Sequence, residues 1–142
     1  MAAGIRRQAR AYALQVLYAL DLNDGQESGD AVASFGDLFE LEVEPASLEF
    51  AGELVTQTRE RVAEIDDAVQ SASRNWRLDR MSRVDRNILR LATCELRHFP
   101  DVPVKVIINE AVELAKRFGT ADSPAFVNGI LDRIAHQLRR DE

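Results

Sequence analysis

The sequence contains very little cysteine and no long apolar segment. Cys94 is the only cysteine among 142 residues, which excludes an internal disulfide. No apolar run approaches the roughly 20 residues that span a bilayer. Residues 1–20 contain arginines instead of the uninterrupted apolar stretch of a secretion signal. These absences favour a reducing, cytoplasmic location without a membrane anchor.

The sequence also lacks the patterns of β-strands and of common active sites. No two-residue alternation of apolar side chains stands out, and neither a glycine-rich phosphate loop nor an HExxH motif occurs. Cys94 and His98 share a helix face, but a catalytic thiol needs a third group and structural zinc needs about four ligands. His136 is the only other histidine. We therefore expect no enzyme, no metal site and no cofactor.

Charge is distributed unevenly along this acidic chain. The formal net charge is −6, yet residues 1–20 hold three arginines and no acid. Residues 21–70 hold 14 acids and two bases, whereas residues 71–100 hold seven bases and three acids. A polyanion would bind where the two basic segments meet. The alternative is that solvated helix faces carry this charge without a partner.

Apolar periodicity predicts helices along most of the chain. They cover about residues 5–22, 82–98, 103–118 and 123–138, with a short helix at 31–43 after a polar loop. Between residues 46 and 74 the apolar positions repeat every three or four residues, which fits one long helix or two helices broken near Ala63–Asp67.

Several residues mark the ends of these helices. Ser82 followed by Asp85 resembles a capping box. Gly119 suits a C-terminal cap, and Ser123 with Pro124 suits the start of the last helix. The predicted fold class is all-α, a compact bundle of about six or seven short helices.

Two groups of side chains on the first helix are candidates for contacts outside the core. Arg6, Arg7 and Arg10 project within about 100° of one another at the edge of the apolar stripe. Tyr18 lies off that stripe, either as a partner contact or as a surface tyrosine lying on a neighbouring helix.

Aromatic and basic residues also recur in the second half of the chain. Phe126 lies two turns before Arg133 on the same side of the last helix, an arrangement that suits stacking on an unpaired base or a place at the edge of the core. Trp76 is expected to be a packing anchor. A basic ridge on helix 82–98, or simply a solvated face, consists of Arg83, Arg86, Arg90 and Arg97.

Three stretches of the sequence are distinctive together: "RRQARAYALQVLYAL", "MSRVDRNILRLATCEL" and "DVPVKVIINEAVELAKRFGTADSPAFVNGILDRIA". In their order and spacing the chain resembles the NusB family of bacterial transcription antitermination factors. The resemblance extends over nearly the whole chain, is strongest over residues 76–135 and is weak over residues 23–50.

The resemblance implies a single NusB-like domain over residues 1–142, built from two packed three-helix units and a connecting element. The N-terminal unit would cover about residues 1–74 and the C-terminal unit about 75–142. It implies no catalysis. It implies pairing with NusE, a small ribosomal subunit protein, and binding to boxA, a single-stranded RNA element in ribosomal RNA operon leaders, so that RNA polymerase reads through terminators.

The resemblance also implies roles for particular residues. Ala125 stands where relatives often carry a base, which implies weak RNA binding by the isolated chain and greater reliance on NusE. The expected RNA contacts are Arg6, Arg7, Arg10, Asp122, Phe126 and Asn128, and the expected NusE contacts are Tyr18 and Asp85.

Two other functions remain open at this point. One is a NusB-like RNA-binding module in ribosomal RNA processing or methylation. The short stretch after the last helix leaves no room for a cofactor-binding domain, so we expect a stand-alone factor. The other is a purely protein-binding helical adaptor, which arginine-dependent RNA binding would exclude. Both a monomer and a homodimer fit the sequence.

Overall fold

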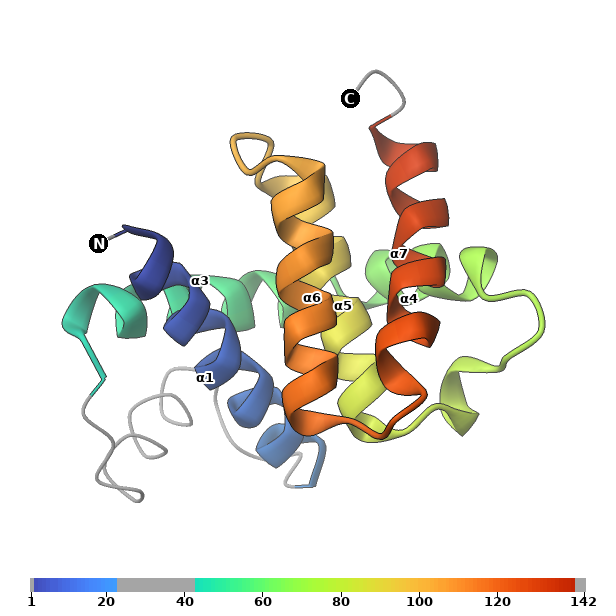
Figure 1. Cartoon of the computed structure of the whole chain (residues 1–142), viewed down its shortest axis with the longest axis horizontal. Coiled ribbons are helices and arrows are strands. Elements are labelled where there is room, and N and C mark those ends of the chain that lie inside the picture. Colours follow the sequence, from blue (N-terminus) through green and yellow to red (C-terminus); the bar gives the residue numbers. More distant parts are fainter. Residues whose placement is uncertain (1, 23–42, 140–142) are drawn as a thin grey trace. The chain divides into compact units, whose positions relative to one another are not determined.

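The computed structural model describes residues 2–22 and 43–139 (Figure 1). These residues are mostly helical and contain no strand, which confirms the all-α fold class. None of the described helices is long and apolar enough to cross a membrane. The loop expected at 23–30 and nearly all of the helix expected at 31–43 lie outside the described residues.

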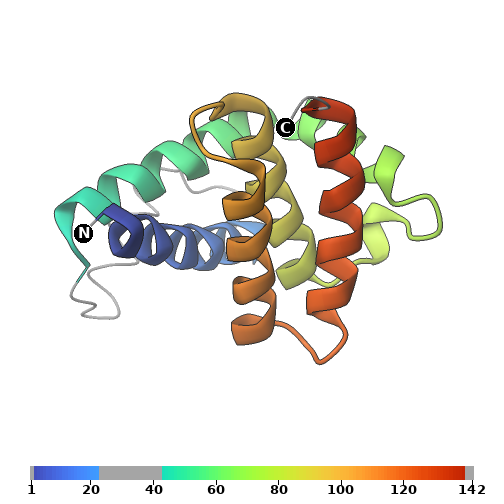
Figure 2. The same ribbon diagram turned by 45° about the horizontal axis from the view of Figure 1, so that its top comes forward.

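The chain forms two compact units, Met1–Glu60 and Arg61–Glu142. The first contains α1 (Ala2–Leu22), which packs on α3 (Pro45–Glu60). In the second, α6 (Val104–Phe118) and α7 (Ser123–Leu138) run side by side, and both pack on α5 (Arg83–His98) (Figures 1 and 2). The other described elements of the second unit are α4 (Val62–Ala72) and the 3-10 turn η1 (Leu78–Arg80).

Two helices, not one, fill the segment between residues 46 and 74. The break lies at Arg61, where φ is −112° and ψ is 20°, slightly before the expected position. Ile65 and Val69 are fully buried on α4, which packs on α5 and α7. The boundary between the two compact units lies at residue 60, and the described part of the second unit contains α4, α5, α6 and α7. The apolar repeat continues across Arg61, so periodicity alone does not reveal the break.

The apolar stripe expected on α1 is confirmed. The start of α3 is tied to α1 by the Ser47 hydroxyl, which donates to the Ile5 carbonyl at 2.8 Å. Tyr18 lies off the stripe, as expected, with 40% of its surface exposed. The buried apolar residues at this spacing are Ala9, Tyr12, Ala13, Val16, Leu17 and Leu20.

Hydrogen bonds fix both ends of α5. At its start the Ser82 hydroxyl accepts from the Asp85 amide at 3.1 Å, which confirms the expected cap. At its end the Arg139 guanidinium donates to four carbonyl oxygens. Two belong to the last turn of α5, where carbonyls have no partner within the helix, and two belong to residues just after the helix. The four oxygens are those of Glu95, Leu96, Phe99 and Val102, at 2.6–3.0 Å.

The turn between α6 and α7 differs in detail from the prediction. Ser123 is buried and does not cap α7; its hydroxyl accepts from the Thr120 amide at 3.0 Å. Asp122 occupies the cap position without a side-chain hydrogen bond to the helix. Gly119 ends α6 as expected, because a Cβ there would lie 2.5 Å from the Ser123 Oγ.

Candidate nucleic-acid interface

The three arginines at the start of α1 are not equivalent. Arg6 and Arg7 are exposed, whereas Arg10 is only 4% exposed. The guanidinium carbons of Arg6 and Arg10 lie 4.8 and 5.9 Å from the centre of the Phe50 ring on α3. Such distances fit cation–π contacts. Arg10 is therefore part of the packing between α1 and α3, and only Arg6 and Arg7 present their charge to solvent.

Arg6 has carboxylates near it as well as the aromatic ring. It lines a groove of about 260 Å³ together with Phe50, Glu49 and Glu53. The acids would repel a phosphate that entered this groove, because like charges in proximity raise the free energy of the complex. Arg7 is exposed as well and does not line the groove.

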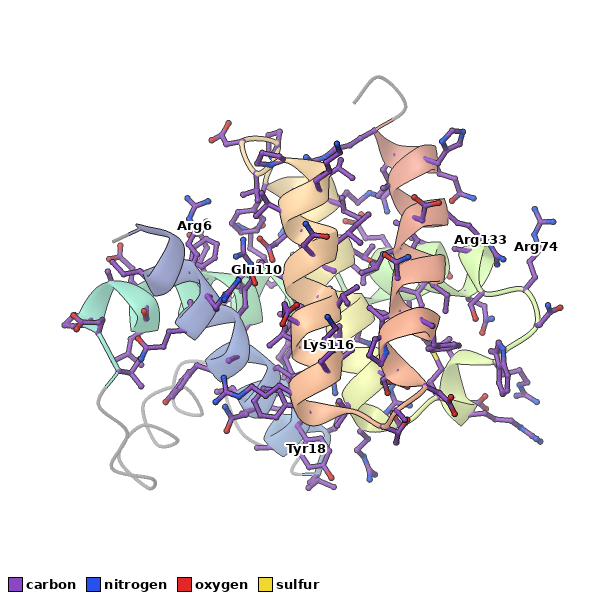
Figure 3. The ribbon with its side chains drawn as sticks, viewed as in Figure 1. Arg6, Tyr18, Arg74, Glu110, Lys116 and Arg133 are labelled. Carbon is purple, nitrogen blue, oxygen red and sulfur yellow. The ribbon has the colours of Figure 1, made fainter. Side chains whose placement is uncertain are left out.

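Tyr18 and Leu22 form an exposed apolar pair at the end of α1. Tyr18 is labelled in Figure 3. Their exposed fractions are 40% and 60%. Residues four apart on a helix are surface neighbours, so the two side chains share one side of α1. An aromatic ring beside an aliphatic side chain on a helix surface is typical of a protein contact.

Asp85 presents a different feature, on the first turn of α5. Its amide is used in the helix cap, but its carboxylate oxygen Oδ1 is buried and accepts no hydrogen bond from any described residue. A buried acceptor without a donor carries a desolvation cost of about 1–3 kcal/mol.

The expected contacts at the start of α7 fall on two sides of the helix. Asp122 and Phe126 are four residues apart and therefore neighbours. Asn128 is exposed but lies about 200° around the helix from Phe126, so α7 does not bring these two side chains together. The exposed Ala125 leaves the adjoining surface without a charge.

Trp76 is not the buried anchor that we expected. Its side chain is 60% exposed, and its ring meets that of Phe126 edge to face, with centroids 6.1 Å apart and planes at 89°. Arg74 and Arg133 lie on the same side of the second unit (Figure 3). The sequence signal for this group was the run of arginines around a tryptophan in "SRNWRLDR", but periodicity does not say whether such a tryptophan is buried.

The basic ridge expected on α5 is interrupted. Arg90 makes a two-pronged ion pair with Asp66 of α4, Nε to Oδ1 at 2.7 Å and Nη2 to Oδ2 at 2.9 Å. The side chains are only 15% and 25% exposed. Arg90 thus joins two helices and does not serve as a phosphate ligand.

Cys94 and His98 do not form a reactive pair. Cys94 is buried, and the Nε2 atom of His98 lies 2.7 Å from Oε1 of Glu64. That hydrogen bond lowers the pKa of the Glu64 carboxyl below its usual value, since it favours the ionised form. No group of three or more metal-ligating side chains occurs among the described residues.

A family model described as the NusB family matches residues 7–136. The chain belongs to the NusB family. The transcription antitermination protein NusB of Sorangium cellulosum is 48% identical over 137 residues, which cover 96% of each chain. The solved structure of T. maritima NusB superposes with a TM-score of 0.84 at 37% identity, covering 93% of this chain and 91% of the other.

A second solved structure contains the antitermination factors NusB and NusE in complex with double-stranded RNA. Its matching chain superposes with a TM-score of 0.80 at 29% identity, covering 94% of this chain and 97% of the other. The resemblance to NusB that the sequence motifs indicated is therefore confirmed over nearly the whole length.

Proposed function

We propose that this chain is a transcription antitermination factor that binds boxA RNA together with NusE and promotes readthrough by RNA polymerase. The observation that carries this proposal is the near-full-length similarity to antitermination proteins named NusB. The solved structure of NusB and NusE in complex with double-stranded RNA supports NusE and RNA as partners. The chain would act in the cytoplasm, within the antitermination complex on RNA polymerase.

Each unit supplies residues suited to an RNA strand. In the first unit, Arg6 and Arg7 are suited to contact phosphates, since both are exposed while Arg10 is packed. In the second unit, Phe126 offers a ring for a base, and Asp122 is a hydrogen-bond acceptor for a base edge beside it. Stacking and edge contacts require an unpaired strand. We therefore propose single-stranded boxA as the ligand.

The NusE contacts are proposed on similar grounds. Tyr18 with Leu22 offers an apolar surface of the kind that protein interfaces bury. Asp85 is a half-buried acid on the first turn of α5, where the resemblance to the family implies a contact with NusE.

The proposed role needs binding without catalysis. His98 is engaged by Glu64 and Cys94 is buried, so neither provides a reactive group. A role in ribosomal RNA processing remains the second candidate, because it would use the same RNA-binding residues.

A binding experiment tests the proposal directly. Fluorescence anisotropy would be measured with boxA RNA, a scrambled RNA of equal length and an RNA duplex, each with and without NusE. We expect boxA to bind more tightly than the other two, and NusE to strengthen boxA binding. Replacing Phe126 by Ala should weaken boxA binding by about 1–3 kcal/mol. Val106→Ala, an exposed apolar residue on α6, is the matched control.

Two results would contradict the proposal. Equal affinity for boxA and the scrambled RNA would exclude sequence readout, and tighter binding to the duplex would exclude the single strand as ligand. A readthrough assay with RNA polymerase would then distinguish antitermination from a role confined to RNA processing.

A further inference from the structure

A groove with no assigned role lies between α7 and the end of α4. Its volume is about 710 Å³, within the 300–1,000 Å³ that ligand pockets typically occupy. We call it the α4–α7 groove. It is lined by Ser71, Ala72, Arg74, Asn75, Asp132, Arg133, His136 and Gln137.

One end of this groove adjoins the aromatic pair of the exposed Trp76 and the half-buried Phe126. Trp76 directly follows Asn75, which lines the groove, and its ring contacts that of Phe126. On α7 the residues Phe126, Arg133 and Gln137 fall within about 40° of one another around the helix. The surface therefore continues from the aromatic pair into the groove, over roughly 16 Å of helix between Phe126 and Gln137.

Two guanidinium groups give the groove its positive charge (Figure 3). Arg133 donates through Nη1 to the Ala72 carbonyl at 3.0 Å, which holds its side chain against the end of α4. A guanidinium has five N–H donors, so Arg133 retains others for a ligand. Arg74 is exposed and makes no hydrogen bond or ion pair with any described residue.

The remaining polar lining suits base edges. Asp132 is an acceptor for an amino group, and the amides of Asn75 and Gln137 both donate and accept. Ala72 is the only apolar side chain in the lining. A helix bound in a groove needs several apolar anchors, whereas a nucleic-acid strand needs cations, an aromatic face and polar groups. The lining therefore fits RNA better than protein.

We propose that the α4–α7 groove binds single-stranded RNA that flanks the boxA element. This inference rests on the proposed RNA-binding function and extends it to a second stretch of the same strand. One flanking base stacks on Trp76, beside the base held by Phe126. The next phosphates lie on Arg74 and Arg133. Successive phosphates of a stacked strand advance about 3.4 Å, so a surface of roughly 16 Å holds more than one nucleotide.

The test compares two RNAs on the full chain with NusE: the boxA element alone, and the same element with a uridine tail at each end. Arg74→Ala should weaken binding of the tailed RNA and lower its salt slope by about 0.7, the contribution of one phosphate on a single strand. Trp76→Ala should weaken the tailed RNA about 5- to 150-fold, as expected for the loss of 1–3 kcal/mol of stacking. Trp76→Phe should restore most of that affinity, because a phenyl ring also stacks.

Lys105→Ala is the matched control, since Lys105 is exposed on α6 and does not line the groove. Lys105→Ala removes the same charge from the same unit, and it should not change the affinity for either RNA. Arg74→Ala should leave the affinity for the untailed element unchanged within twofold. Arg74 and Lys105 are both exposed, so we expect the two alanine variants to fold, which circular dichroism would verify.

The outcomes separate this inference from the proposed function. If the wild type binds neither RNA, the proposed function itself fails. If it binds both and Arg74→Ala behaves like Lys105→Ala on the tailed RNA, the groove does not bind RNA and only this inference is overturned. If Arg74→Ala instead weakens NusE binding in the absence of RNA, the groove is a protein site and the inference is likewise overturned.

Discussion

Guanidinium groups at Arg10, Arg90 and Arg139 are held by neighbours inside the two units. Arg10 lies over the Phe50 ring, Arg90 forms an ion pair with Asp66, and Arg139 donates hydrogen bonds to carbonyl oxygens at the end of α5. The arginine fork with five donors allows such multiple contacts, which a lysine would not provide. Counting arginines in the sequence therefore overestimates the charge available to RNA.

Replacing Arg139 by Ala should lower the free energy of unfolding by about 2–3 kcal/mol. The substitution leaves four carbonyl oxygens near the end of α5 without their donor, and unsatisfied buried acceptors cost about 1–3 kcal/mol each when water does not reach them. Urea unfolding would measure the change. Gln137→Ala, at an exposed position on the same helix, should stay within about 0.5 kcal/mol. Equal stability of both variants would mean that water replaces the guanidinium.

Tyr18→Asp should weaken binding to NusE roughly tenfold or more and leave folding intact. A tyrosine at the centre of an interface often contributes strongly to the binding free energy. A carboxylate in its place would lose its hydration in the complex, which weakens binding. With 40% of its surface exposed, Tyr18 contributes little to the core. Titration calorimetry with NusE would measure the affinity, and Tyr18→Phe should bind nearly as well as the wild type. A large drop in melting temperature for Tyr18→Asp would assign the residue to the core instead.

At the scale of helices, the packing of one helix against the next depends on a few close contacts between side chains or between a side chain and the backbone. The turn from α6 to α7 brings Gly119 against Ser123, and the pair of α4 and α5 is joined by Arg90 and Asp66. Both contacts connect helices that are separate in the sequence. The first contact bears on the start of α7, where the candidate RNA contacts lie, and the second holds α4 against α5.

Gly119→Ala and Gly52→Ala should change stability in opposite directions. A Cβ at Gly119 would lie 2.5 Å from the Ser123 Oγ and 2.8 Å from the Ala115 carbonyl oxygen, so the turn must shift. A Cβ at Gly52, inside α3, meets nothing within 4 Å. Alanine there should add about 0.4–1 kcal/mol by restricting the unfolded chain. Thermal unfolding of the two variants would show whether the signs differ; a stabilised Gly119→Ala would mean that the turn adapts freely.

A double-mutant cycle should detect the contact between α4 and α5. Arg90→Ala and Asp66→Ala each remove one partner of a largely buried, two-pronged pair. We expect a coupling of about 1–3 kcal/mol between the two substitutions, as for partners in one network. Denaturant unfolding of the two single variants and the double variant supplies the cycle. Additive effects would mean that the pair does not hold α4 in the second unit.

At the scale of the whole molecule, the net charge of −6 opposes binding to RNA, so a few exposed cations must provide the attraction. At the start of α1 these are Arg6 and Arg7, because Arg10 is packed. The excess of acids in residues 21–70 would limit binding to other polyanions.

The dependence of RNA affinity on salt should report these two contacts. Each phosphate neutralised on a single strand contributes about −0.7 to the slope of log affinity against log salt, so replacing Arg6 and Arg7 by Ala should flatten the slope by about 1.4. The affinities for boxA and for scrambled RNA should fall nearly equally, since phosphate contacts position the protein on the strand without reading its sequence. Arg10→Ala should barely change the slope and should instead lower stability. Parallel salt curves for the double variant and the wild type would exclude phosphate contacts by Arg6 and Arg7.

The sequence by itself determined the class of fold, most helix ends and the family. Apolar residues at helical spacing on α1, and the Ser82 cap on α5, depend on neighbours within about one turn, which a linear pattern records. The family was identified from three motifs that occur in the family's order along the chain. Apolar periodicity alone indicates only an all-α domain. Tyr18 was assigned correctly to the surface for the same local reason.

Only the tertiary structure decided which helices pack together and which side chains are exposed. The break at Arg61 leaves the apolar repeat intact, so the placement of α4 with α5 and α7 depends on contacts distant in the sequence. The burial of Arg10 depends on Phe50, and the exposure of Trp76 depends on the space around Phe126. Burial is a property of neighbours brought together by folding, and the hydrophobicity of a single residue does not specify those neighbours.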